Sequence, residues 1–231
     1  MSPHDPWSKK KRYTWSDREN AAPFWLKTLE RTASWMSIPH LGVLLVTLQA
    51  LGFLFISMNP EWASVLSLNP AAVKAGEYWR FVTFLSMPLS MSPFWMIFVL
   101  WFMYYIVNTL ESQWGSMRTT LYVVVSVLLT IIYSLVLDYP VMSVSHFESS
   151  LFLAAAMLFP EFEVSLFFLF PVKMKWLAAL SGVMVLIEAW QGTWYDRGYL
   201  LAIYSNFILF FGPGAWRLLQ SYLRRKRFRG E

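Results

Sequence analysis

The stretch SVSHFESSLFLAAAMLFP, residues 143–160, decides the fold class, because it joins serines, a histidine and a glutamate to a short apolar run. As a helix, residues 146–159 would rise roughly 21 Å, which is less than the roughly 30 Å of hydrocarbon in a bilayer. We therefore expect this helix to lie inside a bundle, surrounded by other helices.

The rest of the chain supplies apolar neighbours for this helix. Hydrophobic residues make up 57% of the 231 residues and aromatic residues 19%, which is above the apolar share of a soluble domain. Apolar runs occupy residues 40–58, 93–110, 117–137, 146–159, 176–190 and 199–211. These runs predict an all-α polytopic membrane protein with six helices, of which the fourth is short and central.

The basic residues predict the orientation. Cytoplasmic segments of membrane proteins carry an excess of Lys and Arg. If both termini are cytoplasmic, all of the 19 Lys and Arg fall inside except Lys74, Arg80 and Arg197. The short loops, the absence of cysteine and the absence of a retention signal favour a bacterial inner membrane over an organelle.

The chain divides into three predicted parts. Residues 1–38 form a cytoplasmic tail with an interfacial amphipathic helix, residues 39–215 the six-helix membrane domain, and residues 216–231 a basic cytoplasmic tail. No short apolar core precedes residue 38, so we expect no cleaved signal peptide. The basic tails either bind anionic lipid head groups or only set the topology.

Four further stretches match motifs of a known family. They are GEYWRFVTFLSMP (76–88), LESQWGS (110–116), LFPEFEVSLFFLFPVKMKWLAAL (158–180) and AIYSNFILFFG (202–212). Together they resemble the rhomboid superfamily, which includes intramembrane serine proteases and inactive relatives such as the Derlins. The resemblance implies a rhomboid-like bundle of six helices.

The resemblance also implies structural roles for single residues. Trp79 would anchor the outer loop at the membrane interface, while Arg80 would bind loop carbonyls or a carboxylate. Glu111 would accept backbone N–H groups, and Gly115 would permit a tight turn. The family has a glycine four residues before Glu111, but this chain has Val107, which removes a residue that allows close helix packing.

The residues that proteolysis requires are only partly present. By the family's spacing, the nucleophile position is Ser145. A proteolytic member also needs flanking glycines, whose N–H groups form much of the oxyanion hole, and a histidine base on the sixth helix. Ser143, Val144 and His146 surround Ser145 instead, and residues 198–211 contain no histidine. Adjacent helical side chains do not face each other, so His146 is a poor substitute base, although a His146–Ser150 hydrogen bond is possible.

Polar residues are expected to collect near the outer end of the bundle. The predicted pocket comprises His146, Glu148, Ser150, Glu188 and Asn206. Ionisable residues at membrane depth are functional candidates by default. Two alternatives stay open: Glu188 pairs with Arg197 and only satisfies the bundle, and Asn206 serves helix packing together with the small residues at 150, 154, 198 and 202.

The sequence favours two functions over a third. The first is a pseudoprotease that binds transmembrane protein clients and contacts membrane lipids, with no cofactor, metal site or nucleic-acid partner. The second is a divergent rhomboid intramembrane serine protease with Ser145 as its nucleophile. A small-solute transporter is a weaker third, because no pair of broken helices occurs in matching halves of the chain.

Overall fold

The computed structural model describes residues 37–166 and 170–228, and the predicted amphipathic helix before residue 37 lies outside them. Each of the six apolar runs lies in a helix. These helices are α3 (Leu41–Met58), α7 (Pro93–Trp114), α8 (Ser116–Leu137), α9 (Ser145–Leu158), α10 (Met174–Gln191) and α11 (Trp194–Phe228). Because α11 continues to Phe228, the boundary predicted at 215/216 falls inside a helix.

Within the described part of the chain, three helices are long and apolar enough to cross a membrane. They are α3, α7 and the segment Ser116–Val136 of α8. Three of the six runs thus lie in helices with the length and composition that a membrane span requires. By contrast, α9 has 14 residues, and the 18 residues of α10 include Lys175 and Glu188, which lower its hydropathy.

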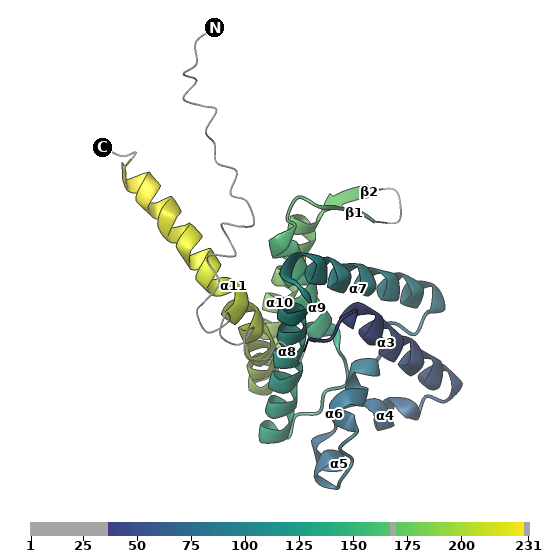
Figure 1. The fold of residues 1–231 in the computed structure, drawn as a ribbon. Helices are drawn as coiled ribbons and strands as arrows, with labels where there is room; N and C mark the ends of the chain where they lie inside the picture. The colour runs from purple at the N-terminus through teal and green to yellow at the C-terminus, as the bar shows by residue number, and fades with distance from the viewer. Residues whose placement is uncertain (1–36, 167–169, 229–231) are drawn as a thin grey trace.

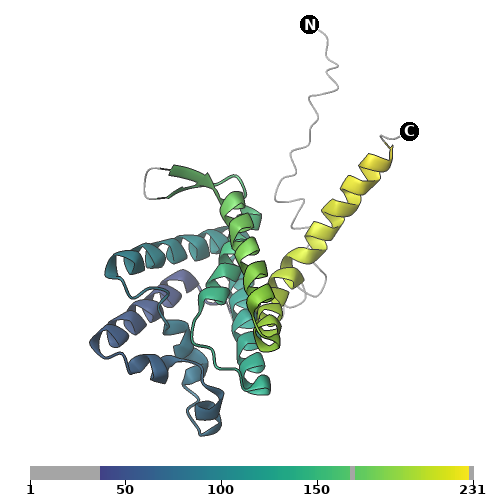
Figure 2. The same ribbon diagram turned by 180° about the vertical axis from the view of Figure 1, so that it is seen from behind.

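The pair α3 and α7 meets the pair α8 and α11 through contacts between α7 and α8, and α9 packs between the pairs. In both views α3 and α7 extend sideways, whereas α8 runs nearly top to bottom beside the first turns of α11 (Figures 1 and 2). The central helix α9 contacts α7, α8, α10 and α11, and seven of its 14 residues are buried. The prediction that this short helix lies inside the bundle is therefore confirmed.

Close packing of α3 on α7 depends on a glycine of α3. A Cβ atom on Gly42 would lie 3.3 Å from Cβ of Val107, and Val107 is fully buried. Close packing at Val107 is therefore present although this position lacks the family's glycine, because a glycine lies on the opposite helix.

The segment between α3 and α7, residues 59–92, is folded and is called the outer segment here after its predicted position. It contains α4 (Trp62–Leu66), α5 (Pro70–Lys74), α6 (Arg80–Thr83) and the 3₁₀ helix η2 (Phe84–Ser86). The 3₁₀ helix packs directly on α3, since a Cβ on Gly52 would lie 1.8 Å from the carbonyl oxygen of Ser86. A backbone bridge between Leu68 and Val141 ties the segment to the chain just before α9.

The link between α9 and α10 contains a β-hairpin, which the all-α prediction missed. Strands β1 (Glu163–Leu166) and β2 (Phe170–Lys173) pair antiparallel, with Glu163 opposite Lys173. Lys173 and Lys175 donate hydrogen bonds of 2.9 and 2.6 Å to Glu161. These hydrogen bonds, of which the one from Lys175 has the larger effect, lower the pKa of Glu161 to about 2.

The contact at Gly52 predicts a large difference between two glycine substitutions. Gly52→Ala should lower the free energy of unfolding by about 2–3 kcal/mol, because the new methyl group has to displace backbone. Gly182→Ala on α10 has nothing within 4 Å and should be neutral or slightly stabilising. Denaturant titration in mixed micelles measures both, and equal effects would contradict the packing of η2 on α3.

Candidate functional site

A cavity of about 280 Å³ lies between α7, α9 and α10. One face of α7 forms its apolar wall, through Phe98, Val99, Phe102, Met103, Ile106 and Val107. These positions repeat at helical spacing, so they share one side of the helix. The polar wall consists of Ser145, Glu148 and Ser149 from α9 and Ser181 from α10. The site therefore combines one carboxylate and three hydroxyls with an apolar surface.

The carboxylate of this cavity is bound to α3. Nε2 of Gln49 donates a hydrogen bond to Oε1 of Glu148, and Gln49 is 1% exposed. Gln49 is eight residues after Leu41 and nine before Met58, so it lies roughly 12–14 Å from either end of α3. Glu148 thus meets α3 near its middle. Gln49 is not among the predicted site residues, although a single amide in an apolar run is a usable signal.

Ser145 and His146 point to different surroundings. Ser145 is exposed at the first residue of α9 and lines the cavity, and its N–H donates to Oγ of Ser143 at 3.1 Å. His146 is directed to α10, where its Nε2 lies 3.1 Å from Oε1 of Glu188. Its ring also meets Tyr199 edge to face, with centroids 5.7 Å apart. In residues 37–164 and 172–212, whose side chains are described, no hydrogen bond joins the Ser145 hydroxyl to a base.

Ser150 and Asn206 lie in the core. The hydroxyl groups of Tyr122 and Ser150 are 2.5 Å apart, and Asn206 donates to the carbonyl of Tyr122 at 2.9 Å and to Oγ of Ser126 at 2.6 Å. Ser150 and Asn206 are 0% and 1% exposed. Their hydrogen bonds join α8, α9 and α11, so the packing alternative for Asn206 fits better than client recognition.

The predicted pocket is therefore divided into three places. Glu148 lies in the cavity, His146 pairs with Glu188, and Ser150 and Asn206 belong to the buried network. The possible His146–Ser150 bond is replaced by these contacts.

The alternative in which Glu188 pairs with Arg197 is not observed, since Glu188 pairs with His146. Arg197 donates to the carbonyls of Ala189 and Trp190, at 2.8 and 3.1 Å. These carbonyls end α10 and lack partners within that helix, so Arg197 closes the α10–α11 turn.

A second polar cluster lies where α11 begins. Asp196 accepts hydrogen bonds from the side chain and N–H of Thr193 and from the hydroxyl of Tyr139. The side chains of Thr193 and Tyr139 lower the pKa of Asp196. Partial burial, followed by the hydrogen bond and charge of Asp196, raises the pKa of Tyr139 to about 12. These contacts cap α11 and fix the loop before α9.

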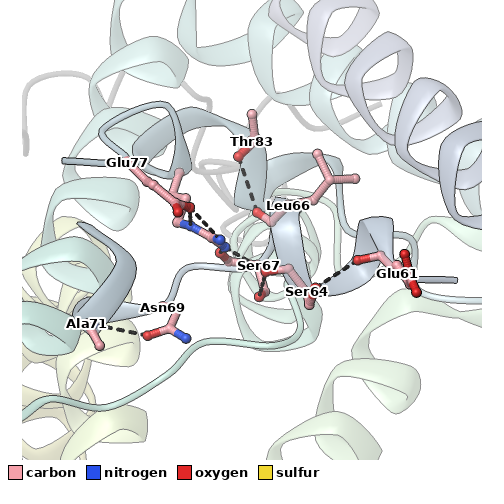
Figure 3. Close-up of polar contacts among 9 residues, drawn as sticks. Glu61, Ser64, Leu66, Ser67, Asn69, Ala71, Glu77 and Thr83 are labelled. Atoms are coloured by element: carbon pink, nitrogen blue, oxygen red, sulfur yellow. Dashed lines mark hydrogen bonds and ion pairs between the residues drawn. The ribbon is translucent and has the colours of Figure 1, made fainter. Parts of the chain in front are cut away.

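Arg80 organises the outer segment, as predicted. Its Nη1 donates to the carbonyls of Ser64 and Ser67 at 2.6 and 2.8 Å, and its Nε donates to Oε2 of Glu77 at 2.7 Å. Figure 3 labels the partners Ser64, Ser67 and Glu77, and it also shows the hydrogen bond from Thr83 to the carbonyl of Leu66. Arg80 is 6% exposed, whereas its neighbour Trp79 is 54% exposed, which fits the predicted interfacial position of Trp79.

Glu111 accepts a backbone N–H group, and Gly115 forms a tight turn. Oε1 of Glu111 accepts the N–H of His40 at 3.0 Å and the hydroxyl of Ser116 at 2.6 Å. Glu111 therefore joins the start of α3 to the α7–α8 turn. Gly115 forms that turn with a φ of 82°, a conformation that a residue with a side chain rarely adopts.

No family model matches this chain, and comparisons with curated proteins and with solved structures found no match. The rhomboid resemblance therefore stays a prediction based on the four motifs. Within the described residues, no group of three or more His, Cys, Asp and Glu side chains could hold a metal ion.

Arg80→Lys should destabilise the outer segment by about 2 kcal/mol, because lysine keeps the charge but cannot form the same fork of hydrogen bonds. The matched control is Lys74→Gln, which removes an ion pair with Asp138 whose side chains are 55% and 67% exposed. That change should cost less than about 1 kcal/mol. The rate of proteolysis within residues 59–92 measures both. A control variant as sensitive as Arg80→Lys would contradict the role given to Arg80.

Proposed function

We propose that this protein is a rhomboid-like multi-pass membrane protein that binds transmembrane segments of client proteins without cleaving them. The observation that carries the proposal is the cavity between α7, α9 and α10. Its wall on α7 is apolar, like the surface of a transmembrane helix, while its wall on α9 and α10 offers hydrogen-bond partners. Polar contacts of this kind stabilise helix pairs in a membrane.

The surroundings of the cavity suit a membrane. Large apolar side chains are exposed along α10, where Leu180, Val183, Met184, Leu186 and Ile187 are all more than 40% exposed. The same holds for Phe94, Ile97 and Trp101 on α7. A soluble protein rarely exposes so much contiguous apolar surface. We assign these faces to lipid contact, with client segments entering beside them.

The distribution of basic side chains supports cytoplasmic termini in a bacterial inner membrane. The start of α8, which carries Arg118, and the hairpin with the first turn of α10, which carry Lys173 and Lys175, lie at one end of the molecule. The helix α5, which carries Lys74, and the start of α11, which carries Arg197, lie at the opposite end (Figure 1). With the first end cytoplasmic, the positive-inside rule is obeyed.

The non-proteolytic part of the proposal rests on the environment of Ser145. Serine is a weak nucleophile at its free pKa and needs an adjacent base. His146 is held by Glu188 at 3.1 Å and by edge contacts with Tyr199 and Tyr204. These contacts direct its imidazole to α10 and α11, so it is not available to Ser145.

Photocrosslinking to a defined client tests this function. A photoreactive residue replaces Val99 in the cavity wall, and the purified protein in vesicles is mixed with a labelled single-span reporter segment. The expected result is a saturable adduct that unlabelled reporter suppresses. The matched control places the same residue at Ile132, which is 54% exposed on α8 and is not part of the cavity wall.

Equal, non-saturable adducts at both positions would contradict client binding in the cavity. The same gel reports on proteolysis. Cleavage of the reporter by the wild-type protein that is lost in Ser145→Ala would contradict the non-proteolytic part and favour the protease.

A further inference from the structure

The cavity wall contains a carboxylate with no cationic partner. In the part of the chain whose side chains are described, the ion pairs involve other acidic residues, and none includes Glu148. Gln49 donates to one oxygen of Glu148, and that bond leaves the second oxygen as an acceptor. The remaining polar atoms of the wall are the hydroxyls of Ser145, Ser149 and Ser181, and the last two are 2.9 Å apart.

The position of this carboxylate makes a missing partner costly. Glu148 meets α3 at Gln49, near the middle of a helix that is long and apolar enough to cross a membrane. An ionised carboxylate without a counter-ion at that depth costs several kcal/mol, and without a cation it avoids this cost by taking up a proton. One amide hydrogen bond offsets only part of the cost of the ionised form. A positive group from outside the chain would hold Glu148 in its ionised form.

The size and shape of the cavity limit what can enter. Its volume is about 280 Å³, just below the roughly 300 Å³ at which small-molecule sites begin. A cavity of this size accepts one long side chain of a neighbouring transmembrane segment. The apolar face of α7 would contact the methylene stem of a lysine, while the ammonium group, a compact charge with three donors, would reach the acceptors. One oxygen of Glu148 already accepts from Gln49, so the bidentate contact that an arginine fork makes with a carboxylate would compete with that bond, whereas an ammonium group needs only the second oxygen.

We propose that Glu148 selects transmembrane segments that carry a lysine near mid-membrane, with the ammonium group bound by the carboxylate of Glu148 and the neighbouring serine hydroxyls. This inference rests on the proposed function, since it specifies which clients the cavity accepts.

The test uses the Val99 photocrosslinker with three reporter segments that differ at one central position, which is lysine, leucine or glutamate. The vesicles contain phosphatidylcholine and phosphatidylglycerol. The lysine reporter should bind about tenfold more tightly than the leucine reporter, as one charge-assisted hydrogen bond predicts. Glu148→Gln retains a partner for Gln49 and should abolish this preference. Glu161→Gln, which changes an exposed carboxylate of the hairpin link, should leave the preference unchanged.

The outcomes separate the inference from the function on which it rests. Saturable adducts of equal strength for lysine and leucine reporters would overturn the lysine inference and keep client binding. No saturable adduct with any reporter would overturn both. A lysine preference that survives in Glu148→Gln would remove the role of Glu148. A preference that disappears when phosphatidylethanolamine is added would overturn the inference in favour of a lipid ammonium group.

Discussion

The length of α9 is the constraint on which the rest of the structure depends. A helix of 14 residues is too short to cross the hydrocarbon of a bilayer, so its polar residues need partners on the surrounding helices. Gln49 of α3 binds Glu148, Tyr122 of α8 binds Ser150, and Ser181 of α10 binds Ser149. Each hydrogen bond fixes α9 to a different helix. The cavity is formed where α7 supplies apolar side chains instead of a polar partner.

Small residues then allow the backbones to approach. Since lipid is as apolar as a leucine side chain, helix association in a membrane depends on close packing and hydrogen bonds rather than on apolar burial. A Cβ on Gly52 would collide with Ser86, and one on Gly198 would lie 2.5 Å from the hydroxyl of Tyr133. The first contact positions the outer segment on α3, and the second brings α11 onto α8. Arg80 donates hydrogen bonds to the carbonyls of Ser64 and Ser67, which would otherwise lack partners inside the outer segment.

The sequence predicts the helices better than it predicts the contacts between them. Apolar runs and the short fourth helix are properties of continuous segments, and the contacts of Arg80 with carbonyls and of Gly115 with the turn depend on local backbone. Partner choice is different, because it depends on the rotation of each helix about its axis. For this reason His146 pairs with Glu188 rather than with Ser150, and the importance of Gln49 was not predicted.

The hydrogen bond between Gln49 and Glu148 joins α3 to α9 beside the cavity. A double-mutant cycle with Gln49→Leu and Glu148→Leu, measured as free energies of unfolding in bicelles, tests this contact directly. We expect a coupling energy of about 1 kcal/mol or more, near the upper part of the range for hydrogen bonds between membrane helices. A cycle of Gln49→Leu with Glu161→Gln should be additive and serves as the control. Additive effects of the Gln49 and Glu148 substitutions would contradict the account.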